Sequence, residues 1–392
     1  MTVTPAPLVA LTVTAPRGVW LDALNACALG ISRQAESRIL TITREEHGTV
    51  LSSYNGSFCV HYQLDDQAGE PLSWGLNHKE LIAAVRTAAP DRRTVSDALP
   101  VELQAQGNTV QVVCQGALVA QLPMLSGPTP RPDEADELVE VSTKQLKKLA
   151  SGVLYAASEL GCRGLEQVRV AAEQDWLELV ATDGRRIAAG SVQLAEAATF
   201  AAFPGGRQLA RVLRLLKDRT TSLGAAPWGG LTVTNGPLRV TIPRHTDTEF
   251  PKHEWISHFT ADTWVDLDRA EFLAAVTWCR DLGVEDTLVI ELHDGATTAR
   301  LHAGHVEERP PARDISQPAS HALDQFSGYR DGKILLAFNP CYIAEILDHS
   351  SASTVRLTLT RSHGPVMFSD ARHDVTDPHT LRAVTMSQRD AY

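Results

Sequence analysis

The segment at residues 179–190, LVATDGRRIAAG, places five consecutive polar residues inside an apolar run. Its aspartate, Asp183, stands two and three positions before the arginines Arg185 and Arg186. A carboxylate beside two guanidinium groups on a tight turn could form a catalytic constellation, with the carboxylate as a base. The same residues are equally typical of a charged hairpin turn or of one wall of a docking pocket. From the segment alone, these three interpretations stay open.

The remaining sequence contains no recognisable catalytic or metal-binding motif. Its fourteen histidines form no H-E-x-x-H motif, and His302 and His305 are interpreted as exposed hairpin residues rather than metal ligands. No G-x-S-x-G, Walker loop or G-x-G-x-x-G after a strand is present. Gly205 and Gly206 could meet a phosphate at a helix start, but a loop entering a helix explains them equally well. We therefore expect no catalytic residue, no metal and no cofactor.

Composition favours a globular protein. The 392 residues are 43% hydrophobic and 21% charged, which suits two to four domains. No apolar run approaches the roughly 20 residues that span a bilayer, and the first residues lack the basic region of a signal peptide, so we expect a cytoplasmic protein. The six cysteines have no C-x-x-C spacing, which favours reduced, mostly buried thiols. The net charge of −11 does not by itself point to nucleic acid.

A threefold repeat organises the chain. Helices that follow short strands are predicted to begin near residues 17, 142 and 268, about 125 residues apart, the last two with the caps Ser142 and Asp268. A second set begins near residues 77, 204 and 339, and β-branched runs with turn residues lie between them. The pattern predicts an α+β fold of three tandem similar domains, each with two helices and antiparallel strands. The predicted domains cover residues 1–130, 138–258 and 262–392.

Basic residues gather on two predicted helices of the middle domain. In a helix expected from Arg207 to Lys217, leucines occupy one face and arginines the opposite face, and the helix after Ser142 has the same division. A single basic face is typical of a solvated helix, but two such faces suit a surface that follows phosphates without reading bases. The candidate DNA-facing residues are Lys144, Lys148, Arg207, Arg211, Arg214 and Lys217.

Several segments resemble one known family in order along the chain. ELVATDGRRIA resembles the A-T-D-G-H-R-L motif of the bacterial β sliding clamps, the processivity subunits of DNA polymerase III. EFPKHEW is similar to the family's F-P-D-Y segment, ILLAFNPCYIAEIL to its G-F-N-x-x-Y helix, and RAVTMSQR to its M-P-M-R tail. Arg185 replaces the motif's histidine, and Gly205-Gly206 replaces a basic pair that the family often has after the domain-two proline.

The resemblance implies a head-to-tail homodimer that forms a closed ring around double-stranded DNA without sequence preference. It implies no enzymatic activity and no membrane association. Partners, namely DNA polymerases, repair proteins and clamp loader subunits, would dock short peptide motifs into a hydrophobic cleft between domains two and three. By matching positions, the cleft residues are Leu165, Thr182, Gly184, Arg185, Arg186, Ile187, Pro251, Ile256, Asn339, Tyr342, Pro365, Val384, Met386 and Arg389.

The leading hypothesis is therefore a DNA sliding clamp, either the main replicative clamp or an accessory one. One alternative is an enzyme on a repeated α+β scaffold with Asp183, Arg185 and Arg186 in its active site. Another is a clamp-like hub that binds proteins and is not loaded on DNA.

Overall fold

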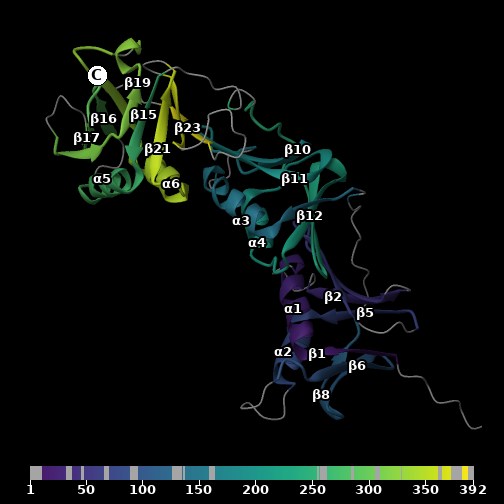
Figure 1. Ribbon diagram of the computed structural model, residues 1–392. Helices are drawn as coiled ribbons and strands as arrows, with labels where there is room; N and C mark the ends of the chain where they lie inside the picture. The colour runs from purple at the N-terminus through teal and green to yellow at the C-terminus, as the bar shows by residue number, and fades with distance from the viewer. Residues whose placement is uncertain are drawn as a thin grey trace, which may run out of the picture. The chain divides into compact units, whose positions relative to one another are not determined.

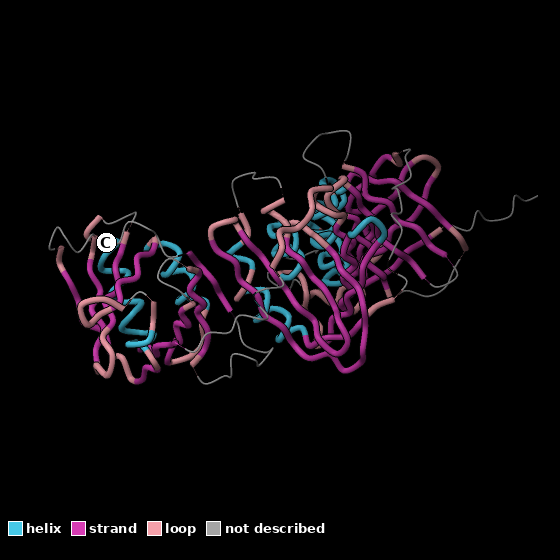
Figure 2. The backbone as a smooth tube through the Cα atoms, turned by 90° about the horizontal axis from the view of Figure 1, so that it is seen from above, coloured by secondary structure: helices cyan, strands magenta, loops and turns pink. Residues whose placement is uncertain are grey.

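Antiparallel sheets and a few helices make up the chain, which confirms the α+β fold class (Figures 1 and 2). The computed structural model describes residues 11–386 apart from 32–37, 46–47, 66–69, 89–95, 126–134, 136, 159–163, 254–255, 257–262, 284–286, 305–309, 328, 361–363 and 372–381. Contacts divide the chain into two compact units. The first unit is Met1–Thr143 with Arg211–Arg244, and the second is Lys144–Ala210 with His245–Tyr392.

The first unit contains an eight-stranded and a four-stranded antiparallel sheet. The eight-stranded sheet has the order β5-β2-β3-β4-β14-β13-β12-β9, and the four-stranded sheet has the order β1-β6-β7-β8. Helices α1 (Arg17–Cys27) and α2 (His78–Thr87) pack against each other, as Figure 1 shows. The strands are β1 (Thr12–Pro16), β2 (Ile39–Glu45), β3 (Gly48–Tyr54), β4 (Cys59–Leu64), β5 (Leu72–Asn77), β6 (Pro100–Gln106), β7 (Thr109–Cys114), β8 (Ala117–Pro123), β9 (Val139–Ser142), β12 (Thr220–Ala226), β13 (Gly230–Asn235) and β14 (Leu238–Ile242).

The second unit repeats this plan with a seven-stranded sheet, β10-β11-β23-β22-β21-β15-β19, and a four-stranded sheet, β18-β17-β16-β20. Helices α5 (Arg269–Asp281) and α6 (Pro340–His349) lie side by side in it (Figure 1). The strands are β10 (Val168–Thr182), β11 (Arg186–Ala202), β15 (Thr263–Asp268), β16 (Leu288–Leu292), β17 (Thr298–His302), β18 (Ala312–Ser316), β19 (Ala319–His321), β20 (Ile334–Phe338), β21 (Thr354–Leu359), β22 (Pro365–Asp370) and β23 (Arg382–Met386).

Helix positions follow the predicted repeat. The helices α1, α3 (Thr143–Ser151) and α5 begin at Arg17, Thr143 and Arg269, which are 126 residues apart each time. Arg17 donates from its side chain to the carbonyls of Val85 and Arg86 at the end of α2. Arg269 likewise donates to the carbonyl of Leu347 in the last turn of α6 and to that of Ala352, which follows the helix. The first and third repeats thus satisfy the terminal carbonyls of their second helix with the same residue. The domain boundaries 1–130, 138–258 and 262–392 stay a prediction.

Side-chain caps lie at the starts of α2, α5 and α6, and the cap predicted at Asp268 is confirmed. The Asp268 carboxylate accepts the Glu271 amide at 2.9 Å, and the Asn339 amide oxygen accepts the Cys341 amide at 2.9 Å, with Pro340 in the first helical position. Asn77 caps α2 by accepting two amide hydrogens. α3 begins directly after Ser142, as expected.

The third repeat has a continuous apolar core. Side chains of α5 and α6 pack against the inner faces of both sheets of the second unit, with Phe272, Phe338 and Phe368 almost completely buried. In the first unit, the buried Trp20 donates its indole N–H to the Val101 carbonyl at 3.0 Å. Each core thus holds its helices against the adjoining strands.

The structure corrects the expected helix over residues 207–217. α4 covers only Gly206–Leu213, so Arg214 and Lys217 follow the helix instead of lying on it. The Asn235 side-chain oxygen, from a distant part of the sequence, accepts the backbone amides of Lys217 and Asp218 at 2.8 and 3.0 Å, which stabilises a turn after the helix.

His302 is buried rather than exposed, and its imidazole Nε2 lies 3.4 Å from a Glu291 carboxylate oxygen. His305 lies outside the described residues. Among the described cysteines four are buried and Cys341 is exposed, and all five are free thiols, while Cys162 lies outside the described residues. No helix within the described part of the chain is long and apolar enough to cross a membrane.

Candidate functional site

The turn between β10 and β11 is held by its own aspartate. Asp183 Oδ1 accepts the backbone amides of Arg185 and Arg186 at 2.9 and 3.0 Å, and Oδ2 accepts a hydrogen bond from Arg186 Nε at 3.1 Å. Gly184 adopts φ +85°, which glycine allows without strain. Both oxygens of the carboxylate are therefore used in forming the turn, and the geometry gives Asp183 a structural role instead of that of a general base.

The Arg186 guanidinium connects the turn with two other segments. It forms ion pairs with Asp183 and with Glu345 of α6, and it donates to the Tyr155 carbonyl at 3.0 Å. Its Cζ lies 4.6 Å from the centre of the Tyr342 ring and 5.3 Å from that of Tyr155. Only 9% of the side chain is exposed. A planar cation with several donors is suited to holding such a set of carboxylates, carbonyls and rings.

Arg185, in contrast, points to solvent. A hydrogen bond to Tyr342 raises the pKa of the Arg185 guanidinium, which stays cationic. Leu165 is half-buried, and its Cδ1 lies 3.3 Å from the position that a Cβ on Gly184 would occupy. Thr182 closes the turn, because its hydroxyl donates to the Arg186 carbonyl and accepts the Gly184 amide.

An apolar cluster forms the floor beside this turn. Ile187 of β11 is paired with Val384 of β23, and Ile256 packs on both, with 2–8% of each residue exposed. Met367 of β22 and Phe250 complete the cluster together with Val180 and Ala189. Residues from four distant segments of the sequence thus meet in one buried apolar cluster.

The other predicted residues lie on the same elements. Pro365 is paired with Met386 across β22 and β23, and Asn339 caps the helix whose third residue is Tyr342. Pro251 is half-buried, and its carbonyl lies 3.1 Å from His253 Nδ1. Arg389 lies outside the described residues.

Sequence reasoning missed Tyr155 and Glu345. Glu345 stands three positions after Tyr342 on α6, so helical spacing could have placed it on the same face. Tyr155 lies in the short 3₁₀ helix η3 (Leu154–Ala156), which has no periodic signal in the sequence. Its ring is stacked on His349, with centroids 4.7 Å apart. Burial lowers the pKa of His349, against the effect of nearby acidic groups.

The candidate DNA-facing residues are all exposed in the unit that contains them. Lys144 and Lys148 lie one turn apart on α3, and Arg207 lies in the first turn of α4. In the first unit, Arg211 lies over the Phe58 ring at 5.0 Å, and Lys217 forms an ion pair with Asp22 at 2.8 Å. Each is thus placed at a solvent-facing surface, and Lys217 has an acidic partner there.

Comparisons with known proteins agree on the fold. The β subunit of DNA polymerase III from Pseudomonas aeruginosa has a TM-score of 0.78 and 16% identity, covering 97% of this chain and 100% of that one. The DNA polymerase sliding clamp from Bacillus subtilis has a TM-score of 0.77 and 15% identity, covering 97% and 99%. The chain therefore has the fold of these clamps, and the α+β expectation and the resemblance read from the sequence are confirmed at that level.

Sequence similarity is weaker. The β sliding clamp of Synechococcus elongatus is 24% identical over 249 residues, which cover 60% of this chain and 62% of that protein. The match thus spans a little under two thirds of this relative's length. No protein-family model matches the chain.

Proposed function

We propose that this chain, which has the fold of the β sliding clamps, is a DNA sliding clamp of the bacterial cytoplasm that tethers DNA polymerases and repair proteins to duplex DNA. It would act as a non-catalytic homodimer ring built from three similar domains per chain. One observation carries the proposal: four distant segments, which the resemblance assigns to a peptide cleft, meet around Arg186 and Ile187 on a fold shared over nearly the whole chain.

The peptide site has two chemically different parts. The apolar cluster around Ile187, Ile256 and Val384 suits the leucine and phenylalanine side chains of a short motif. Beside it, the exposed Arg185 and the Tyr342 ring offer a polar rim for the backbone of an extended peptide. Polymerases, repair proteins and clamp loader subunits would compete for this one surface.

The test of the peptide site is a titration with a fluorescent peptide that carries adjacent leucine and phenylalanine anchors. Ile187→Asp places a charge in the apolar cluster and should weaken binding at least tenfold, while Arg219→Asp, at an exposed position of the first unit, should leave it unchanged. Deletion of residues 386–392 should weaken binding as well, because it removes the end of β23. Equal affinity in all these variants would exclude this site.

DNA contact is proposed through Lys144, Lys148, Arg207, Arg211, Arg214 and Lys217. A closed ring needs only weak contacts with DNA, because it stays linked to a circular DNA molecule even when those contacts break. Six lysine and arginine side chains would give a retention that falls as salt rises.

The ring is tested by loading the chain onto nicked circular DNA with the clamp loader of the same bacterium and ATP. The clamp should stay on the circle and be lost after a single restriction cut, because it slides off the ends. Equal loss from circular and linear DNA would contradict the proposal.

The protein-binding hub is the remaining alternative. Lys148→Glu together with Arg214→Glu should shorten the retention of the clamp on circular DNA, and unchanged retention would favour the hub.

A further inference from the structure

The same arrangement occurs twice in the described chain, once within each unit. In the β3–β4 turn the Asn55 side-chain oxygen accepts the amides two and three residues later, both at 3.0 Å, and Asp183 does the same in the β10–β11 turn at 2.9 and 3.0 Å. The strand orders β3-β4-β14-β13-β12-β9 and β10-β11-β23-β22-β21-β15 then correspond strand by strand. We call the β4–β14 pairing the first junction and the β11–β23 pairing the second junction.

A pocket lies at the corresponding place in each junction. Ala26 and Gly152 stand two residues before the 3₁₀ helices η1 (Ala28–Gly30) and η3, and both line a pocket. The strand registers make Asn235 the counterpart of Asp370, and both are lining residues too. The cavity measures about 360 Å³ at the first junction and about 20 Å³ at the second.

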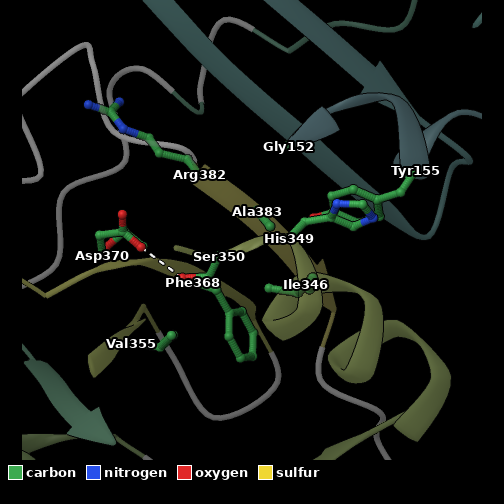
Figure 3. Close-up of a pocket in the computed structure, with 11 residues that line it drawn as sticks. Gly152, Tyr155, Ile346, His349, Ser350, Val355, Phe368, Asp370, Arg382 and Ala383 are labelled. Carbon is green, nitrogen blue, oxygen red and sulfur yellow. Dashed lines mark hydrogen bonds between the residues drawn. The ribbon is translucent and has the colours of Figure 1, made fainter. Parts of the chain in front are cut away.

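Aromatic stacking accounts for the small second pocket. Figure 3 shows the rings of Tyr155 and His349 lying against each other at its edge, with Ser350 hydrogen-bonded to Asp370 across from them. At the first junction the corresponding positions hold Leu29 and Leu215, which have no planar rings to stack. The first pocket is therefore left open where the second is filled.

The open pocket has an acidic wall and an apolar floor. Its wall carries the carboxylates of Asp22 and Asp218 and the phenol of Tyr62, while Lys217 forms an ion pair with Asp22 at 2.8 Å. Asp218 has no ion-pair partner among the residues that the structure describes, so one negative charge is left over. Burial, with Asp22 and Asp218 nearby, raises the pKa of Tyr62 and keeps the phenol a neutral donor and acceptor.

Glycine allows the Asp218 carboxylate to take this position. Gly236 has φ +56°, and a Cβ there would lie 1.7 Å from Asp218 Oδ2. The carboxylate thus sits directly over the β13–β14 turn, while the amide of Asp218 is held by Asn235. The floor beside it is Ala26, Leu215, Pro237 and Leu238. A volume of about 360 Å³ is within the range of roughly 300–1,000 Å³ seen in small-molecule sites.

We propose that the cavity of the first junction binds an organic cation with an aliphatic stem, such as the guanidinium side chain of arginine. The cation would lie against Asp218 and Tyr62, with its stem along Leu215 and Leu238. Charge complementarity favours a cation, and the exposed Asp218 carboxylate beside an apolar floor favours one that carries a hydrocarbon chain. The inference does not depend on DNA loading or on the peptide site.

The experiment titrates the full chain with arginine amide and with citrulline amide, which keeps the α-ammonium group but has a neutral ureido side chain in place of the guanidinium, by isothermal calorimetry. Arginine amide should bind at least tenfold more tightly. Asp218→Asn should weaken it at least fivefold, whereas Asp370→Asn, the matched change near the small pocket of the second junction, should have no effect. Equal binding of both amides, or an unchanged affinity in Asp218→Asn, would overturn the proposal.

A second variant separates a lost site from a lost fold. Leu215→Phe adds a ring where His349 stands at the second junction, so it should fill the cavity without changing its charge and abolish arginine amide binding while the melting temperature is kept. Retained binding in this variant would refute the assignment to this cavity. A short peptide with one arginine, compared with its citrulline form, tells whether the site takes free cations or a protein side chain: selective binding of either arginine probe supports the site.

Discussion

Replacing Arg186 by alanine should destabilise the second unit strongly, because one buried guanidinium connects three segments there. The variant loses the hydrogen bond to the Tyr155 carbonyl, the ring contacts to Tyr155 and Tyr342 and the pair with the mostly buried Asp183. A hydrogen bond from a charged donor contributes about 1.5 kcal/mol or more and each ring contact about 0.5–1 kcal/mol. The half-exposed Glu345 adds little, so we expect a loss of about 3 kcal/mol in the free energy of unfolding.

Calorimetry converts this loss into a measurable shift. The second unit, Lys144–Ala210 with His245–Tyr392, falls in the size range where 1 kcal/mol lowers the melting temperature by roughly 2–4 °C. The expected shift is therefore roughly 6–12 °C. Arg185→Ala is the matched control, because the neighbouring arginine is exposed and should cost less than about 0.5 kcal/mol. Equal melting temperatures of the two variants would show that Arg186 does not hold these segments together.

Three further predictions concern the turn, pH and the thiols. Gly184→Ala should lower the free energy of unfolding by about 1–2 kcal/mol in urea titrations, because φ is +85° there and the new Cβ would crowd Leu165; a neutral result would mean that the turn rearranges. Burial lowers the pKa of His78, His302 and His349, so below about pH 6.5 the unfolded chain binds more protons than the folded chain. The free energy of unfolding should therefore fall from pH 7 to pH 5. His78→Gln should make this fall less steep, and an equally steep fall in the variant would show that His78 does not contribute to it. Maleimide should modify Cys341 before the four buried cysteines, and the adduct should weaken peptide binding because it adjoins Tyr342. Cys341→Ser should remove both effects. An adduct that leaves the peptide affinity unchanged would argue against the polar rim of Arg185 and Tyr342.

The repeat and the helix starts could be predicted from the sequence because they depend on local signals. Caps such as Asp268 and Asn339 form hydrogen bonds within a few residues, so composition and spacing are enough to find them. The end of α4 could not be found in this way. It depends on Asn235, which lies 18 residues after Lys217 and reaches back to the amides of the turn.

The candidate site was predictable only in part, for a similar reason. The turn residues 182–187 stand together in the sequence, and the resemblance supplied Ile256, Tyr342 and Val384. The contacts of the Arg186 side chain could be identified only from the structure, because its partners Tyr155 and Glu345 are 31 and 159 residues away in the sequence. No periodicity connects residues at such separations, so the contacts had to come from the structure.

The two junction pairings also determine when each sheet can be completed during synthesis on the ribosome. β4 ends at Leu64, but its partner β14 begins at Leu238, so the edge of β4 waits for the chain between them to be made. At about 5–20 residues per second, that wait is roughly 9–35 s. The edge of β11, which ends at Ala202, waits in the same way for β23, which begins at Arg382. Each nascent sheet is thus open to wrong partners for seconds, and chaperone capture of stalled chains should decline once residue 244, and later residue 386, has emerged.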